Sequence, residues 1–470
     1  MNARTIAGFA VGPVATAAIS LVTVPAVTWA FSADDVGRFN ILQLSVSFVV
    51  LLASMGLDQG YVREFHETDD AAVLVRSAFL PCLLVAMLLT VPAVVLAEPL
   101  AQLLFDLSDP RVIWLVAASS LAALLARLLS LVLRMKERSL AFSASQAVPK
   151  LLFLVVLGPV FLIAVTREFL LLEVALLISW VAAAVVTAWA TRDTWFGALS
   201  ARLDRQLLRR LLRYSLPLVV AGLGYWALTA ASSVALRSMS SLAELGVYSV
   251  ALSFAGAAVV VQSIFSVVWA PVVYRWAVEE HDLDRVDRVA GRLLAVVALV
   301  FCAVGAFSFL LDLVLPARYD AVKYLVLATI AAPLLYTLSE VTGIGINLAR
   351  RTSWSVAATV LALLVSAVLN LLLVPLLGAQ GAVLATMVAY VAFLVMRTEA
   401  SRQLWRPLPR GRLYVTVTVL CSLAAATVLV GPDTGHWTSL VWAALTPVVL
   451  VAFRREWPAM LRPVSGAWTR

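Results

Sequence analysis

The 470-residue chain is too hydrophobic for a water-soluble protein. Hydrophobic residues make up 63% of it and charged residues only 13%, whereas soluble domains carry about 25% charged residues. This composition excludes a soluble enzyme and predicts an integral membrane protein. The net charge of +8 needs no nucleic-acid partner, because basic loops beside anionic lipid account for it.

Apolar runs long enough to cross the hydrocarbon core as α-helices follow one another along the whole chain. Short loops join them. We therefore expect an all-α polytopic membrane protein with about fourteen transmembrane helices. The predicted spans are residues 6–31, 39–62, 76–97, 112–133, 147–166, 169–190, 214–236, 246–270, 290–311, 322–347, 354–375, 380–396, 412–430 and 437–453.

Two stretches of the chain share one pattern about 210 residues apart. In each, an acidic residue precedes a glycine and an aromatic residue, and a basic residue follows one hydrophobic span later. Gly37 corresponds to Gly246 at an offset of 209 residues, and Arg63 to Arg275 at an offset of 212. Six predicted spans separate the copies. Because six is even, the two halves have the same orientation and are parallel repeats, a trait of transporters.

The repeat predicts two six-helix lobes with additions. The segment from Leu199 to Arg213 alternates leucine and arginine at helical spacing, so we expect a basic amphipathic helix along the inner leaflet. The predicted divisions are an N-terminal lobe (1–192), a cytoplasmic amphipathic linker (193–213), a C-terminal lobe (214–400), and two additional helices with a cytoplasmic tail (401–470).

The basic residues also predict an orientation. With a cytoplasmic N-terminus, most of the 35 Lys and Arg residues fall in inner loops or at the two ends, which is the positive-inside pattern. Both termini are then cytoplasmic. Arginine outnumbers lysine by 32 to 3, a composition typical of GC-rich bacterial genomes. The expected location is a bacterial cytoplasmic membrane.

Basic residues in or beside the spans are candidate ligands for an anionic substrate, because an intramembrane charge is costly and often functional. Arg127 lies within span 112–133 and would bind an anion, snorkel, or pair with another helix. Arg63 and Arg275 stand at inner span ends, and Arg237 stands at an outer one. These three residues either meet substrate on entry and exit or act as ordinary anchors and loop residues.

Two carboxylates and three aromatic residues complete the candidate site. Asp58 and Glu340 would bind a coupling proton or sodium ion, form an ion pair that locks one conformation, or serve a local structural role. Tyr225, Trp226 and Trp269 would stack on sugars, or pack and sit in the interfacial belt. The three cysteines lie in apolar spans and the three histidines in loops, so no metal or other cofactor is expected.

Several short motifs of the second half resemble those of polysaccharide-export proteins. These proteins form the flippase branch of the multidrug/oligosaccharidyl-lipid/polysaccharide (MOP) superfamily. The motifs are Leu216-Pro217-Leu218, Glu244-Leu245-Gly246-Val247-Tyr248-Ser249, Trp269-Ala270-Pro271, the run from Asn370 to Pro375, and Gly378-Ala379-Gln380-Gly381-Ala382.

The resemblance implies two six-helix lobes in a V around a central cavity, lined by the first, second, seventh and eighth spans. It implies a transporter that moves a polyprenyl-diphosphate-linked oligosaccharide from the cytoplasmic to the outer leaflet by alternating access. The implied partners are that substrate, membrane lipid, a polysaccharide polymerase and glycosyltransferases, with no nucleic acid.

Three alternatives remain open. A cation-coupled multidrug antiporter should carry acidic residues well inside the first lobe, and the first span has none between Ile6 and Ser32. A peptidoglycan-precursor flippase should carry more arginine there. A membrane-embedded glycosyltransferase or polymerase should show an acidic metal-binding motif or a large outer loop.

Overall fold

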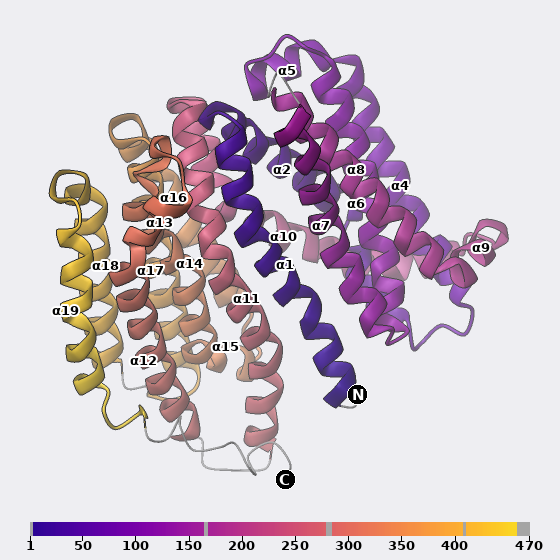
Figure 1. Cartoon of the computed structure of the whole chain (residues 1–470). Helices are drawn as coiled ribbons and strands as arrows, with labels where there is room; N and C mark the ends of the chain where they lie inside the picture. The colour runs from indigo at the N-terminus through magenta and orange to yellow at the C-terminus, as the bar shows by residue number, and fades with distance from the viewer. Residues whose placement is uncertain (1–2, 164–167, 279–283, 408–409, 458–470) are drawn as a thin grey trace. The chain divides into compact units, whose positions relative to one another are not determined.

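The computed structural model describes residues 3–163, 168–278, 284–407 and 410–457 (Figure 1). The regular elements of these residues are helices. In chain order they are α1 (Ala3–Ala30), α2 (Ala33–Ser54), α3 (Leu57–Glu64), α4 (Ala71–Val95), α5 (Ala97–Phe105), α6 (Arg111–Met135), α7 (Ser139–Ile163), α8 (Phe169–Ala190), α9 (Arg192–Ser200), α10 (Arg205–Met239), α11 (Leu242–Val278), α12 (Asp284–Phe307), η1 (Ser308–Leu310), α13 (Leu311–Val314), η2 (Ala317–Tyr319), α14 (Val322–Thr342), α15 (Ile344–Leu348), α16 (Ser353–Leu377), α17 (Ala379–Leu404), α18 (Gly411–Thr434) and α19 (Trp437–Ala452).

The prediction of an all-α membrane protein is confirmed. Among the described residues, twelve helices are long and apolar enough to cross a membrane. Two shorter apolar helices, Ala15–Ala30 and Trp437–Ala452, match the first and last predicted spans. The fourteen expected spans therefore each have a helical counterpart, and α8 has the predicted bounds of 169–190.

The chain forms two compact units. Unit 1 comprises Met1–Arg237 and Ser241–Gly246, and unit 2 comprises Ser238–Ser240 and Val247–Arg470. Unit 1 is built around α6, which packs mainly on α8 and also on α2, α4 and α7. Unit 2 is built around α14, which packs on α17, α12 and α18. Helix α10 belongs to unit 1, so the lobe boundaries at 192 and 214 stay a prediction. The end of the expected cytoplasmic tail, 458–470, lies outside the described residues.

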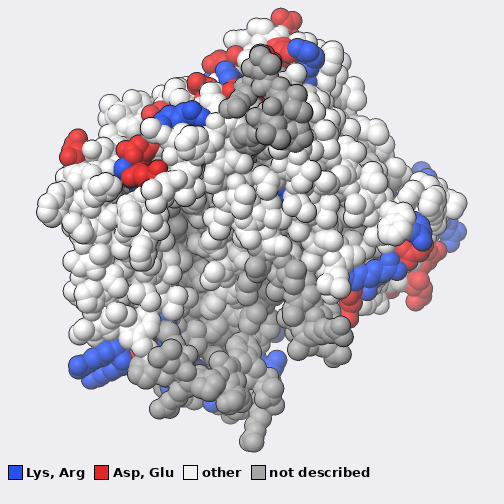
Figure 2. All heavy atoms as spheres, viewed as in Figure 1, with Lys and Arg blue, Asp and Glu red and all other residues white. Residues whose placement is uncertain are grey.

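Polar groups in the apolar helices are largely satisfied by their own helix. Thr90 donates to the carbonyl oxygen of Ala86 at 2.8 Å, and Thr187 to that of Ala183 at 2.8 Å. Such bonds matter in hydrocarbon, where an unpaired polar group costs several kcal/mol. On the face seen in Figure 2 the charged side chains gather at the margins, and the area between them carries almost none.

The expected amphipathic helix of residues 199–213 is instead divided between two helices. Helix α9 ends at Ser200, and α10 begins at Arg205 and continues to Met239. Asp204 causes the new start, since its carboxylate accepts hydrogen bonds from the backbone N–H groups of Leu207 at 3.1 Å and Gln206 at 2.8 Å. These bonds also hold the pKa of Asp204 below its ordinary value. Asp204 is thus the N-cap of α10.

The duplicated glycines lie where the first turns of α2 and α11 meet within unit 1. A Cβ atom on Gly37 would collide with the carbonyl oxygen of Leu242, and one on Gly246 with that of Ala33. The contact is therefore reciprocal, with each glycine opposite the backbone of the other copy. Glycine is needed at both positions because only its missing side chain lets two helix backbones approach so closely.

Candidate functional site

The second predicted span is broken where it carries its acidic residue. Helix α2 ends at Ser54 and α3 begins at Leu57, because Met55 (φ 46°) and Gly56 (φ 66°) both adopt the left-handed conformation. A Cβ on Gly56 would also lie 2.7 Å from the carbonyl oxygen of Ser215 in α10. The break places Asp58 in the first turn of α3. Broken membrane helices of this kind build binding sites in transporters.

Asp58 and Arg127 form an ion pair inside unit 1. Arg127 donates from Nη2 to Asp58 Oδ2 at 2.7 Å. The Asp58 side chain is 6% exposed, whereas that of Arg127 is 50% exposed. Between Trp114 and Arg134, the other residues of α6 are buried or half-buried. The buried carboxylate therefore holds an arginine that emerges from an otherwise covered helix.

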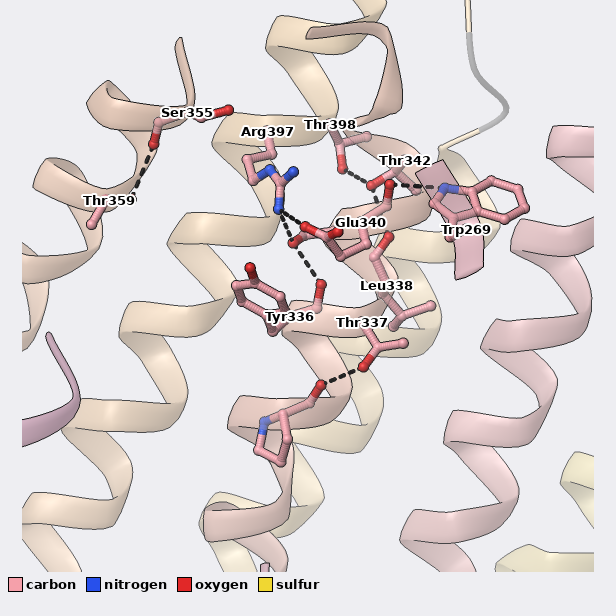
Figure 3. Close-up of polar contacts among 12 residues, drawn as sticks. Trp269, Tyr336, Thr337, Leu338, Glu340, Thr342, Ser355, Thr359, Arg397 and Thr398 are labelled. Carbon is pink, nitrogen blue, oxygen red and sulfur yellow. Dashed lines mark hydrogen bonds and ion pairs between the residues drawn. The ribbon is translucent and has the colours of Figure 1, made fainter. Parts of the chain in front are cut away.

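Unit 2 contains a second ion pair on its central helix. Arg397 of α17 donates from Nη1 to Glu340 Oε1 at 2.7 Å and to Ser339 Oγ at 3.0 Å. Figure 3 shows the Arg397 side chain pointing toward Glu340, with Tyr336 beside them. The Arg397 side chain is 6% exposed and that of Glu340 is 17% exposed. This pair is largely enclosed by the protein.

Aromatic and hydroxyl groups surround the second pair. The rings of Tyr336 and Phe393 stack with centroids 5.7 Å apart, and the Arg397 guanidinium lies 5.4 Å from the Phe393 centroid. The Thr342 and Thr398 hydroxyls lie 2.7 Å apart (Figure 3). Helix α14 ends at Thr342 immediately beyond Glu340, so this pair also stands at a helix break. The surroundings rigidify the pair and leave Arg397 enclosed.

Trp269 lies in this enclosed region. Its Nε1 donates to the backbone carbonyl oxygen of Glu340 at 3.1 Å, and its ring stacks on Phe265 with centroids 5.5 Å apart. It is 5% exposed and belongs to a core cluster with Val273 and Val286. The structure therefore brings together two predicted site residues, Trp269 and Glu340, through packing.

The other predicted aromatic residues lie on α10 in unit 1. Trp226 donates from Nε1 to Ser47 Oγ at 3.1 Å, and its ring lies 4.7 Å from that of Phe48. Tyr225 is exposed. Trp226 is therefore held against α2, the helix that leads to Asp58.

The remaining predicted arginines occupy separate places. The Arg63 guanidinium lies over the Tyr214 ring, 4.4 Å from its centroid. Arg275 is exposed. Arg237 donates to the carbonyl oxygens of Leu104 at 2.8 Å and Leu103 at 2.9 Å, which are at the C-terminal end of α5. A cation there complements the helix dipole, so Arg237 caps α5 within unit 1.

The sequence patterns do not single out Arg397. The predicted span 380–396 stops one residue before it. Helix α17 in fact continues to Leu404. The four-residue spacing from Phe393 to Arg397 was the available signal, because it places the arginine on the same helix face as an apolar ring.

A surface cavity of about 420 Å³ lies in unit 1 near α9. Beside it, Lys136 donates to Asp193 Oδ2 at 2.7 Å, and Arg138 donates to the same oxygen at 3.3 Å. The Lys136 hydrogen bond lowers the pKa of Asp193. These contacts tie α9 to the loop after α6. The lining residues are Asp69, Asp70, Ala71, Ala72, Lys136, Asp193, Thr194 and Gly197.

The family model described as polysaccharide biosynthesis protein matches residues 4–276, more than half of the chain. The chain belongs to this family. None of the curated proteins compared with the chain matches it in sequence.

Solved structures share the fold of this polysaccharide biosynthesis protein. The lipid II flippase MurJ, in an inward closed conformation, has a TM-score of 0.69 and 10% identity. The match covers 98% of this chain and 100% of the MurJ chain. An inward-facing multidrug resistance MATE family transporter of the MOP superfamily has a TM-score of 0.54 and 16% identity. The match covers 82% of this chain and 96% of the transporter chain. A MATE structure in a bent conformation has a TM-score of 0.53 and 13% identity, and the match covers 89% of this chain and 95% of the MATE chain. At these identities the similarity shows the fold alone, which this chain shares with MurJ and with MATE transporters of the MOP superfamily.

Proposed function

We propose that the protein is a flippase that moves a polyprenyl-diphosphate-linked oligosaccharide from the cytoplasmic to the outer leaflet by alternating access. The family, the MOP fold and the Arg127–Asp58 pair support this function. A sugar chain on a diphosphate cannot cross hydrocarbon unaided, because each unpaired polar group costs several kcal/mol. Such a substrate needs a polar path and a cation for its diphosphate.

The observation that carries the proposal is the half-exposed guanidinium of Arg127. Arginine presents five N–H donors in a planar fork that suits phosphate oxygens. The bond to Asp58 uses one Nη2 donor, so other donors of the exposed group are geometrically able to reach a ligand. An arginine in a membrane protein commonly marks a substrate pathway. Arg127 is thus the diphosphate ligand.

Asp58 gives this site a resting state. With no substrate bound, the carboxylate compensates the charge of Arg127 and fixes the direction of its side chain. When a diphosphate binds, it competes with Asp58 for the guanidinium. The released carboxylate lies in the first turn of α3, just after the break at Met55 and Gly56. Substrate binding is thereby coupled to a joint in the second span, where a change of conformation can start.

The membrane and the direction follow from the charge pattern. Basic residues concentrated in alternate loops support cytoplasmic termini in a bacterial cytoplasmic membrane. Arg63 then stands at the cytoplasmic end of the second span, where an incoming diphosphate would arrive. Glycosyltransferases would supply the substrate on that side, and a polysaccharide polymerase would use it on the other.

The test is deletion of the gene followed by lipid extraction from sealed membranes. Loss of the flippase should leave polyprenyl-linked oligosaccharide on the cytoplasmic side, where it is protected from enzymes added outside. No such accumulation would overturn the proposal. The sugars recovered also separate this function from transport of a peptidoglycan precursor, and a cation-coupled multidrug antiporter would change drug efflux without lipid accumulation.

A complementation series then tests the site. Arg127→Gln should fail to restore export when its amount in the membrane equals that of the wild type. Arg134→Gln is the matched control, because Arg134 is an exposed arginine two turns further along α6. Equal export by both variants would remove Arg127 from the substrate path.

A further inference from the structure

A glutamate outside the site just described is fully buried in unit 1. Glu173 of α8 is 0% exposed. Neither of its carboxylate oxygens has a hydrogen-bond partner among the described residues. An ionised carboxylate without any partner in such surroundings is very costly. Its surroundings therefore favour the neutral acid over the carboxylate.

Among the described residues, no cation of the helices packed against α8 is hydrogen-bonded to Glu173. Helix α6 has no charged residue between Arg111 and Arg127. The charged residue of α7 is Lys150, in the middle of that helix. It lies about 13 Å deeper than Glu173 along the bundle, at a rise of 1.5 Å per residue. Helix α9 is at the opposite end of α8.

The charged groups near the start of α8 are paired with one another. Arg111 Nη2 lies 2.7 Å from Asp109 Oδ2. A hydrogen bond from Arg111 lowers the pKa of Asp109 itself, so Asp109 stays ionised. On α2, Asp34 is exposed. Asp35 there is paired with Arg38 at 2.9 Å.

A second unpartnered polar group lies in the same helix interface. Ser119 of α6 is 0% exposed, and its hydroxyl has no partner among the described residues. Ala126 and Ala184 pack together where α6 meets α8. Ser119 precedes Ala126 by about two turns and Glu173 precedes Ala184 by about three. Both polar groups thus lie on the sides of α6 and α8 that carry these alanines, about one turn apart.

Glu173 differs in this respect from the two carboxylates expected to bind a coupling ion. Asp58 and Glu340 are each held by an arginine at 2.7 Å, so a proton could bind there only after an ion pair breaks. Glu173 can gain or lose a proton without breaking any such pair. It lies one turn from the start of α8.

We propose that Glu173 is the proton-binding site that couples transport to a pH gradient, an inference that rests on the proposed flippase function. The carboxylate takes a proton from water on the side of the membrane where α8 begins, forming an O–H bond, and the neutral acid is sealed in the conformation seen here. When the protein opens toward the opposite side, water from that side reaches the acid and the same O–H bond breaks, so that the proton is released across the membrane from where it was taken up. No redox partner is required.

The proton itself can be detected in the full-length protein without any substrate. Infrared spectra would be recorded at neutral pH in vesicles of phosphatidylethanolamine and phosphatidylglycerol. The wild type and Glu168→Gln, an exposed glutamate at the start of α8, should both show the C=O stretch of the protonated acid. Glu173→Gln should lose part of that band. An unchanged band in Glu173→Gln would overturn the assignment of a proton to Glu173.

Coupling is tested in the same vesicles with a fluorescent short-chain polyprenyl diphosphate bearing one N-acetylhexosamine. A pH gradient should speed wild-type transport several-fold. Glu173→Gln should keep exchange without a gradient and lose the stimulation. Stimulation retained by Glu173→Gln, or absent from an active wild type, would overturn the coupling role. If the wild type does not exchange the probe at all, the flippase function fails instead, while the infrared result still decides whether Glu173 holds a proton.

Discussion

Each unit of the molecule places an ion pair on its central helix, but the two pairs have opposite polarity. On α6 the helix residue is Arg127, and its partner is the carboxylate of Asp58. On α14 the helix residue is Glu340, and its partner is the guanidinium of Arg397. The repeat offset of 209 to 212 residues places Arg127 opposite residues 336–339, immediately before Glu340. Nearly equivalent positions thus carry opposite charges.

The two pairs also differ in how they are exposed, and this suggests different roles. In unit 1 the carboxylate is buried and half of the arginine side chain is exposed. In unit 2 the arginine is enclosed by Tyr336 and Phe393, and the carboxylate is only slightly exposed. An exposed cation is able to bind an anion, whereas an enclosed one serves chiefly to neutralise its partner. The Arg127–Asp58 pair therefore suits a ligand site, and the Arg397–Glu340 pair suits a structural role.

The largest effect on stability is expected from breaking the enclosed pair. Arg397→Ala leaves the Glu340 carboxylate without its cation, which should cost about 3–5 kcal/mol of folding stability. The apparent melting temperature in detergent should fall accordingly. Replacing both partners, as in Arg397→Met with Glu340→Leu, should recover most of the loss. If Arg397→Ala were as stable as the wild type, the Arg397–Glu340 ion pair would contribute nothing to folding stability.

Removing the exposed Arg127–Asp58 pair should have a small effect on stability and a large effect on transport. Arg127→Gln with Asp58→Asn keeps a neutral hydrogen-bonded pair, so the melting temperature should change little. Loss of a charge-assisted bond to the diphosphate costs about 1.5–3 kcal/mol, or about tenfold to a hundredfold in transport rate at low substrate. Asp58→Asn alone keeps the arginine and should retain binding of the diphosphate. Normal transport by the double variant would make this pair structural as well.

A smaller effect is expected from a substitution at Trp269, which distinguishes a packing role from sugar stacking. Trp269→Phe keeps an aromatic ring beside Phe265 and removes the Nε1 bond to the Glu340 carbonyl oxygen. Stability should fall by about 1 kcal/mol, and transport should be unchanged once protein amounts are matched. A selective loss of transport at full stability would assign Trp269 to the substrate path.

The smallest expected effect is a pH dependence at the end of unit 1 that contains α9. The hydrogen bond from Lys136 lowers the pKa of Asp193 in the folded protein. The stabilisation is therefore complete above the ordinary aspartate pKa of about 3.9, and it is lost as the pH falls through the lower folded-state value. Melting temperatures between about pH 6 and about pH 2 should converge for the wild type and Asp193→Asn at the acid end. Curves that stay parallel would contradict this.

Sequence patterns predicted the helices well because hydrophobic length alone decides which segments can cross a membrane. They also singled out Asp58 and Arg127, since isolated charges in apolar spans are conspicuous. Pairing was beyond the sequence, because it depends on which helices pack together. Arg397 could not be predicted as a residue of the span, because the apolar run ends before the helix does. The break at Met55 also gave no warning, as methionine rarely adopts a left-handed conformation.

The most direct test of the central claim is equilibrium binding of polyprenyl diphosphate and polyprenyl monophosphate to the purified protein. The account predicts that the wild type prefers the diphosphate and that Arg127→Gln with Asp58→Asn loses this preference, with Arg134→Gln behaving as the wild type. An equal preference for the diphosphate in the wild type and the double variant would contradict it, because Arg127 would then not be the diphosphate ligand.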